Sequence, residues 1–165
     1  MPKRSNPQLR LQLTRSQQPA DPKQQFFQSK GIDINLPTHN PQVSTWREIQ
    51  WLLHTGELET AYQTACNAND RMVLLRLMGE TGCVVARLGT ATQNKVFSMV
   101  GEIMAAGQQH DYHVLPWIFE VVKLGGVKGL APFVRDALSK VLFNLTSDPD
   151  EKGVLAAQLH PRVAM

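Results

Sequence analysis

The chain has 165 residues and a formal net charge of +3; 42% of its residues are hydrophobic and 19% are charged. These values predict one globular domain with a sizeable core, and they exclude a membrane-spanning protein, because the longest apolar run is far too short to cross a bilayer. Secretion is not expected, since no apolar stretch follows the basic first ten residues. Two cysteines, Cys66 and Cys83, indicate small core residues of a reducing compartment rather than a disulfide framework.

The first part of the chain, residues 1–43, is predicted to be a basic arm. It is rich in Gln, Pro, Asn, Ser and basic residues and sustains no apolar period. Such a segment buries too little surface to offset its ordering entropy, so we predict that it is extended or disordered. Six basic residues against Asp21 and Asp33 give it a net charge of +4, which leaves −1 for the remainder. They are Lys3, Arg4, Arg10, Arg15, Lys23 and Lys30.

The arm also holds two apolar spots. One is the pair Phe26 and Phe27, and the other is the GIDINLP run, in which Ile32, Ile34 and Leu36 alternate with other residues. This alternation is typical of an extended stretch that lies along a groove. Two interpretations stay open: a linker that packs a few side chains on its own domain, or a partner-binding motif.

The predicted helical domain covers residues 44–165 and begins with a helix at Ser44 and Thr45. Thr45 and Glu48 fit a capping box at the start of this helix. The helix should end near Gly56, and its apolar stripe consists of Trp46, Ile49 and Leu53.

A helical hairpin is predicted over residues 56–82. The first helix carries an apolar stripe at helical spacing, and the polar run NAND then ends it, because Asn and Asp favour turns. Asp70 is a natural N-cap for the second helix, Met72 to Met78, which is apolar nearly all round and should be the most buried element. The stripe of the first helix consists of Leu58, Ala61, Tyr62, Ala65 and Cys66.

Further helices follow the hairpin. A short helix or turn is expected at 83–89, then helices from Thr90 or Thr92 to Ala106, from 111–114 to 124, over about 130–146, and from a cap at Ser147 to about His160. No segment alternates with period two long enough to predict a strand. The fold class is therefore all-α, an array of antiparallel helical hairpins with an extended N-terminal arm. The residues expected inside the two longest of these helices include Val96, Phe97, Val100, Ile103, Met104, Val134, Leu138, Val141, Leu142 and Leu145.

No pattern of catalytic or metal-binding residues emerges. His110 and His113 lie at metal-ligand spacing, but no third or fourth ligand completes a zinc site, so solvated histidines beside a helix cap are the favoured interpretation. Cys66 lies on an apolar stripe, and carboxylates are scattered singly. We expect no enzyme, no cofactor and no metal. The alternative is a hydrolase or redox protein that uses Cys83 or Cys66 with one of these histidines.

Basic residues in the later helices are candidates for partner binding. Lys123, Lys128, Arg135 and Lys140 are predicted to line one basic edge, which suits an acidic protein surface or a nucleic-acid backbone. The other interpretation is ordinary solvated positions, with Lys123 stabilising a helix C-terminus. With the arm, the complete set of candidate partner-binding residues is Lys3, Arg4, Arg10, Arg15, Lys23, Phe26, Phe27, Lys30, Lys123, Lys128, Arg135 and Lys140.

The central hairpin resembles the C-terminal helical domain of the plant TORTIFOLIA/SPIRAL microtubule-associated proteins. The motifs that carry the resemblance are, in order, Gly56-Glu57 with Ala61-Tyr62, Asp70 with Leu74-Leu75 and Arg76-Leu77-Met78, and Thr81-Gly82 with Val84. The sequence departs from the family pattern at Glu57, where Asp is usual, and at Cys83, where Pro is usual. Weaker similarities exist to the C-terminal domain of the katanin regulatory subunit and to that of large mRNA-decapping scaffolds.

The resemblance implies a non-enzymatic protein-docking domain. It implies tubulin or a microtubule-bound protein as the partner, in the cytoplasm and on the cytoskeleton, and the basic arm suits an acidic tubulin surface. The tubulin-binding helical-repeat array that precedes this domain in the family does not fit within 165 residues, so binding through such an array is not expected. A cilium or flagellum, with its axoneme, is a further expectation from the build of the chain. The alternative is a scaffold module of an RNA-processing, decapping-type complex, although the arm has no RNA-binding motif.

Overall fold

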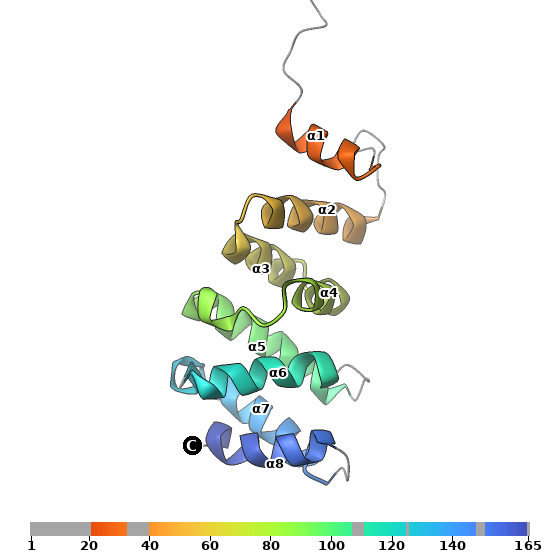
Figure 1. Ribbon diagram of the computed structural model, residues 1–165. Helices are drawn as coiled ribbons and strands as arrows, with labels where there is room; N and C mark the ends of the chain where they lie inside the picture. The colour runs from red at the N-terminus through yellow and green to blue at the C-terminus, as the bar shows by residue number, and fades with distance from the viewer. Residues whose placement is uncertain (1–20, 33–39, 107–110, 125, 148–150, 165) are drawn as a thin grey trace, which may run out of the picture. The chain divides into compact units, whose positions relative to one another are not determined.

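The computed structural model describes residues 21–32, 40–106, 111–124, 126–147 and 151–164 (Figure 1). Within these residues the chain forms eight α-helices and two short 3₁₀ helices, and no strand, so the prediction of an all-α fold is confirmed. The chain divides into two compact units, Met1–His39 and Asn40–Met165, which are treated separately below.

The described part of the first unit is a helix, α1 (Pro22–Ser29). Asp21 caps it by accepting a hydrogen bond from the Lys23 amide at 2.9 Å, and Pro22 stands at its first position. Gly31, at φ +69°, ends it in a Schellman motif, in which the Ile32 amide donates to the Phe27 carbonyl. The prediction that 1–43 lacks regular structure is therefore wrong for this helix. The N-cap at Asp21 and the C-terminal Schellman motif at Gly31 stabilise this helix, although it lacks an apolar stripe.

The second unit begins with α2 (Pro41–His54), several residues earlier than predicted. Asn40, not Thr45, is the N-cap, and its side chain accepts from the Gln42 amide at 2.9 Å. Pro41 follows at the first helical position, so cap and proline together start the helix before the predicted capping box. Thr45 and Glu48 lie inside the helix. Gly56, at φ +81°, ends it as predicted.

The predicted central hairpin consists of α3 (Leu58–Asn67) and α4 (Arg71–Thr81). Asp70 caps α4 by accepting from the Met72 and Val73 amides, at 2.9 and 3.2 Å, as expected. Asn69 in the corner has φ +51°, a conformation that Asn tolerates better than most residues. The α4 residues Leu74, Leu75, Leu77 and Met78 are nearly solvent-free as predicted, and Val73 is buried with them. Met72 is 57% exposed and Arg76 is also exposed, so the helix is buried on one side and not all round.

The later elements also follow the predicted order, except for a 3₁₀ helix at Gly126–Gly129 that was not predicted. They are the 3₁₀ helix η2 (Val85–Arg87), α5 (Thr90–Ala105), α6 (Asp111–Lys123), the 3₁₀ helix η3 (Gly126–Gly129), α7 (Pro132–Leu145) and α8 (Glu151–Ala164). Helix α8 is longer than expected, because it continues through Pro161. The predicted cap at Ser147 and Pro149 involves residues 148–150, which lie outside the described residues.

The helices of the second unit are arranged in two layers (Figure 1). Helix α5 packs between α3 and α7 in one layer, while α6 packs between α4 and α8 in the other, and α2 packs on α3. One core runs between the layers, and the residues predicted inside α5 are all buried in it. In α7, Val134, Leu138 and Leu142 are buried, while Val141 and Leu145 are partly buried against the same core. This arrangement leaves one face of α3, α5 and α7 open.

Candidate functional site

The large apolar residues of the TORTIFOLIA/SPIRAL pattern lie in the core, whereas Gly56, Glu57, Arg76 and Gly82 are exposed. Tyr62 is fully buried, and its hydroxyl hydrogen-bonds the Thr81 hydroxyl at 2.6 Å, so two parts of the motif contact each other. Its ring also lies 5.5 Å from that of Trp117 on α6. Burial raises the pKa of the Tyr62 phenol, and this hydroxyl therefore stays protonated. The buried part of the motif therefore holds α3, α4 and α6 together.

Arg76 is the charged residue within the apolar run of α4. It both reaches a carboxylate and emerges at the edge of the helix. Its Nε lies 3.4 Å from Glu80 Oε1, and more than half of its side chain is exposed. The guanidinium also stacks 4.0 Å from the centre of the Trp46 ring, a cation–π contact that ties α4 to α2.

Helices α3 and α5 are joined by a carboxylate. Gly89, the N-cap of α5, has no side chain for capping, and Glu59 of α3 supplies the acceptor instead, 2.8 Å from the Gly89 amide. Thr92 and Gln63 also donate to this carboxylate. Burial alone would raise the pKa of Glu59, but the hydrogen bonds from Thr92, Gly89 and Gln63 outweigh it and lower the pKa below the ordinary value.

Helices α5 and α7 are joined by an amide side chain. Asn94 of α5 accepts from the Ala131 amide just before α7, and its Nδ2 donates to the carbonyls of Thr90 and Gly129 at 3.0 and 3.3 Å. Together with Glu59, Asn94 therefore fixes the spacing of the three helices that form the open face.

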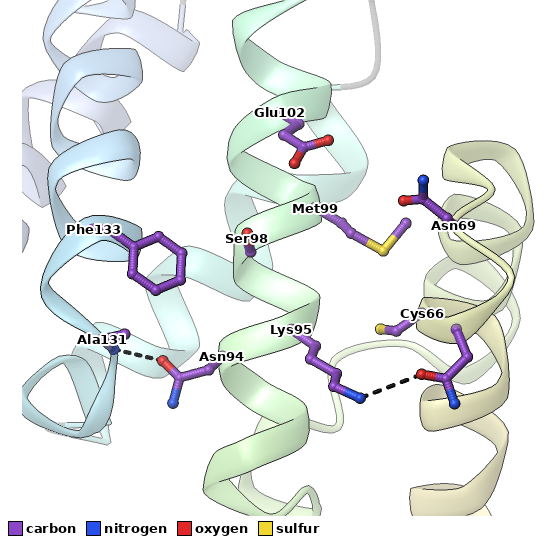
Figure 2. Close-up of a pocket in the computed structure, with 10 residues that line it drawn as sticks. Cys66, Asn69, Asn94, Lys95, Ser98, Met99, Glu102, Ala131 and Phe133 are labelled. Atoms are coloured by element: carbon purple, nitrogen blue, oxygen red, sulfur yellow. Dashed lines mark hydrogen bonds between the residues drawn. The ribbon is translucent and has the colours of Figure 1, made fainter.

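A groove of about 480 Å³ crosses this face between α3, α5 and the start of α7 (Figure 2). Phe133 lines it from α7 with 65% of its surface exposed, and Met99 lines it from α5 (Figure 2). A second hollow of about 490 Å³ shares Phe133 and continues along α5 and α7. The groove is lined by Cys66, Asn67, Asn69, Asn94, Lys95, Ser98, Met99, Glu102, Ala131 and Phe133.

The groove combines an exposed aromatic ring with charges of both signs. Lys95 donates to the side-chain oxygen Oδ1 of Asn67 at 3.3 Å, and Glu102 pairs with Arg71 at 3.3 Å. The second hollow contains Asp136 and Lys140. Such a mixed surface suits a protein segment with an apolar anchor and polar flanks, as found in the core and rim of protein interfaces.

The predicted partner-binding residues lie in different places. Lys3, Arg4, Arg10 and Arg15 lie outside the residues that the structure describes, and Lys23, Phe26, Phe27 and Lys30 lie in or directly after α1, where the two phenylalanine rings meet edge to face at 5.0 Å. The Ile34 and Leu36 part of the GIDINLP run also lies outside the described residues.

The four basic residues of the helical unit are not all brought together. Lys123 and Lys128 are exposed at the end of α6 and in η3. Lys140 lines the second hollow, whereas Arg135, five residues earlier on α7, points about 140° away around the helix axis. The Arg135 Nε is buried without a hydrogen-bond partner. Lys140 thus lines the second hollow, apart from Lys123 and Lys128 at the end of α6 and in η3, and Arg135 points away from Lys140.

The candidate catalytic residues gain no geometric support. Burial raises the pKa of the Cys66 thiol to about 11 and also raises that of the exposed Cys83, so both thiols are protonated at neutral pH. His110 lies outside the described residues, and the His113 side chain is likewise not described. Within the described ranges, no group of three or more potential metal ligands is found, and no helix is long and apolar enough to cross a membrane.

Sequence reasoning missed the groove, and in particular Phe133. A signal exists: Phe133 directly precedes the buried Val134 on α7, so it falls outside the apolar stripe and is an unusually large apolar side chain for an outward position. The groove itself requires knowledge that α3, α5 and α7 share one layer.

Comparison with known proteins gives a match to one family model. Residues 43–149, well over half of the chain, match the model described as TORTIFOLIA1 C-terminal. No curated protein matches the chain.

Proposed function

The chain belongs to the TORTIFOLIA1 C-terminal family, and from this premise we propose that it is a non-enzymatic, microtubule-associated adaptor. The observation that carries the proposal is the family match over residues 43–149, which spans α2 to α7. The sequence resembles microtubule-associated proteins of this family, and we therefore propose that its partner is tubulin or a protein already bound to microtubules.

The helical unit and the arm have different roles in this proposal. The arm carries a net charge of +4 and is attracted to the acidic tubulin surface, an interaction that salt weakens. The groove, with Phe133 as its apolar anchor, binds a segment of a second protein. An adaptor needs separate contacts for its two partners. Here the groove lies on the helical unit, whereas the net positive charge is carried by the arm.

Co-sedimentation with microtubules tests the main proposal. The full chain should pellet with microtubules at low salt, and the pelleted fraction should fall as exposed charges are screened at higher salt. A parallel measurement with single-stranded RNA addresses the decapping-scaffold alternative. A chain that stays in the supernatant with microtubules but binds RNA would contradict the cytoskeletal proposal and favour that alternative.

A matched pair of substitutions on α7 tests the separate role of the groove. Phe133→Ser removes the exposed ring from the groove, whereas Phe143→Ser removes an equally exposed ring, 62% exposed, that stacks on His160 instead. If the groove serves a second partner, both variants pellet with microtubules as the native chain does. A loss of pelleting confined to Phe133→Ser would place the groove on the lattice and contradict the adaptor arrangement.

We also propose that the chain has no catalytic activity of its own. The raised pKa values of Cys66 and Cys83 leave little thiolate at neutral pH, and the thiolate is the nucleophile. A thiol-reactive probe should label both cysteines no faster than a free thiol. Rapid labelling of one cysteine at pH 7, slowed by His113→Ala, would instead favour the hydrolase or redox alternative.

The cytoplasmic cytoskeleton is the proposed location, with a cilium or flagellum as the specific site. A compact helical unit with a basic arm suits a protein that crosses a microtubule lattice, such as an axoneme. Immunolocalisation in ciliated cells tests this step: signal on cytoplasmic microtubules alone would retain the microtubule proposal and reject the axonemal location.

A further inference from the structure

A basic edge forms where the helices of the second unit end. Helices α6 and α8 pack side by side and both end at the edge that carries the C-terminus (Figure 1). The 3₁₀ helix η3 follows α6 there, and Gly129 in η3 lies against Thr90 at the start of α5, directly after η2. Four separate elements thus meet at one edge of the array.

Each of these four elements places a basic residue at this edge. Arg87, Lys123, Lys128 and Arg162 stand in the last turns of η2, α6, η3 and α8, and all four are exposed. In the part of the chain that the structure describes, none of them forms an ion pair. We name these four residues the corner patch. Only Arg87 and Arg162 were not among the predicted partner-binding residues.

The positive charge of the corner patch is not cancelled by its surroundings. The negative ends of α6 and α8 are offset by the positive ends of α5 and α7, which begin at the same edge without an acidic residue in their first turns. The acidic residues near this edge are Glu120, one turn before Lys123, and Glu59, whose carboxylate accepts from the Gly89 amide two residues after Arg87. The four cations therefore exceed the nearby negative charge.

From this charge and placement, we propose that the corner patch binds an extended, glutamate-rich peptide segment of a protein partner. Packed helices lie about 10 Å apart, so three neighbouring element ends span about 20 Å, which an extended peptide crosses in about six residues. Leu124, half exposed beside Lys123, offers contact for aliphatic parts of the peptide. Phe119, 41% exposed and one turn before Lys123, adds an apolar contact. The family match, from which the microtubule proposal follows, favours an acidic protein segment over a single-stranded nucleic acid.

The source of the peptide follows from the proposed function, on which this inference rests: it is an acidic segment exposed on the microtubule surface.

The test uses a fluorescently labelled decaglutamate peptide and the full chain, followed by fluorescence anisotropy. Binding should be measurable at about 50 mM salt and should weaken steadily as salt screens the exposed charges. The double variant Lys128→Glu and Arg162→Glu should weaken binding about tenfold, because each exposed pair contributes up to about fivefold in affinity. The control is Arg47→Glu, which makes the same change of charge as Arg162→Glu in the middle of α2.

Comparison of single variants separates a site from general charge. Arg162→Glu should weaken binding several-fold and Arg47→Glu less than twofold, with both variants keeping the native circular dichroism spectrum and melting temperature. Equal losses of peptide affinity for the two variants would overturn the corner patch. It would also be overturned if a single-stranded oligonucleotide bound more tightly than the peptide and this binding also depended on Arg162. Absence of peptide binding at 50 mM salt would overturn it as well.

Co-sedimentation distinguishes failure of this inference from failure of the proposed function. If the native chain binds decaglutamate through the corner patch but does not pellet with microtubules, the patch stands and the microtubule proposal fails. If the native chain pellets and Arg162→Glu pellets equally well with unchanged peptide binding, the microtubule proposal stands and the patch fails.

Discussion

At the scale of single residues, Glu59 of α3 caps the N-terminus of another helix, α5, whereas a capping side chain normally belongs to the helix that it caps. It accepts hydrogen bonds from Gly89, Thr92 and Gln63 and so joins α3 to the start of α5. Glu59→Gln removes the charge but keeps the shape, and we expect the free energy of unfolding at pH 7 to fall by about 1–2 kcal/mol. Urea unfolding followed by circular dichroism measures this change. Glu57→Gln, two residues away and exposed, is the control and should change it little.

The pH dependence of this contribution has a definite sign. Because the pKa of Glu59 is lowered on folding, its stabilisation is present above the ordinary value of 4.5 and is lost as pH falls through the folded value. The difference in stability between the native chain and Glu59→Gln should therefore shrink below about pH 4.5. A difference that stays constant from pH 7 to pH 3 would contradict the assigned role of the charge.

The buried pair of Tyr62 and Thr81 makes a second prediction at this scale. Tyr62→Phe removes the hydroxyl that bonds Thr81 at 2.6 Å, and we expect a loss of about 1–2 kcal/mol in the free energy of unfolding. Thr81 also donates to the Leu77 carbonyl, so Thr81→Val has a cost of its own. A double-mutant cycle isolates the shared bond, and purely additive losses would show that these two hydroxyls do not stabilise each other.

At the scale of elements, α4 is the central helix of the core. Leu75 is 8% exposed, and Leu75→Ala should lower the free energy of unfolding by about 2–5 kcal/mol, because it removes buried methyl groups and leaves a cavity. Met72 on the same helix is 57% exposed, so Met72→Ala is a matched control with a change within about 0.5 kcal/mol. Similar melting temperatures for the two variants would mean that α4 does not anchor the core.

The elements differ in how well the sequence predicts them, and the reasons are physical. Helix α4 is predictable because its apolar run and the Asp70 cap both act locally. Helix α1 has only weak apolar periodicity and is specified by its caps at Asp21 and Gly31, which a search for apolar stripes passes over. The start of α2 was misplaced because two local start signals compete, and Asn40 with Pro41 prevails over the capping box at Thr45.

The groove was not predictable in the same way. It depends on the packing of α3, α5 and α7 in one layer, and on the Glu59 and Asn94 bonds, which link residues 30 and 37 positions apart. The corner patch was half predicted, since Lys123 and Lys128 belonged to the expected basic edge. Arg87 and Arg162 joined only when the structure brought η2 and the end of α8 to that edge (Figure 1).

At the scale of the whole molecule, the charge of the arm makes the last prediction. Replacement of Lys3, Arg4, Arg10 and Arg15 by Gln changes the formal net charge of the arm from +4 to about 0, without touching the described residues. If long-range attraction brings the chain to the acidic microtubule surface, this full-length variant should pellet several-fold less at about 50 mM salt. Co-sedimentation over a salt series measures the effect.

The control for the arm is a chain in which residues 1–20 are shuffled, so that charge is kept and order is lost. Attraction by net charge predicts that the shuffled chain pellets like the native one, while recognition of a specific motif predicts that it behaves like the neutral variant. The difference between native and neutral chains should also vanish near 0.5 M salt, where the screening length is only about 4 Å. A difference that persists at that salt concentration would contradict the electrostatic role, because contacts that survive such screening are short-range and specific.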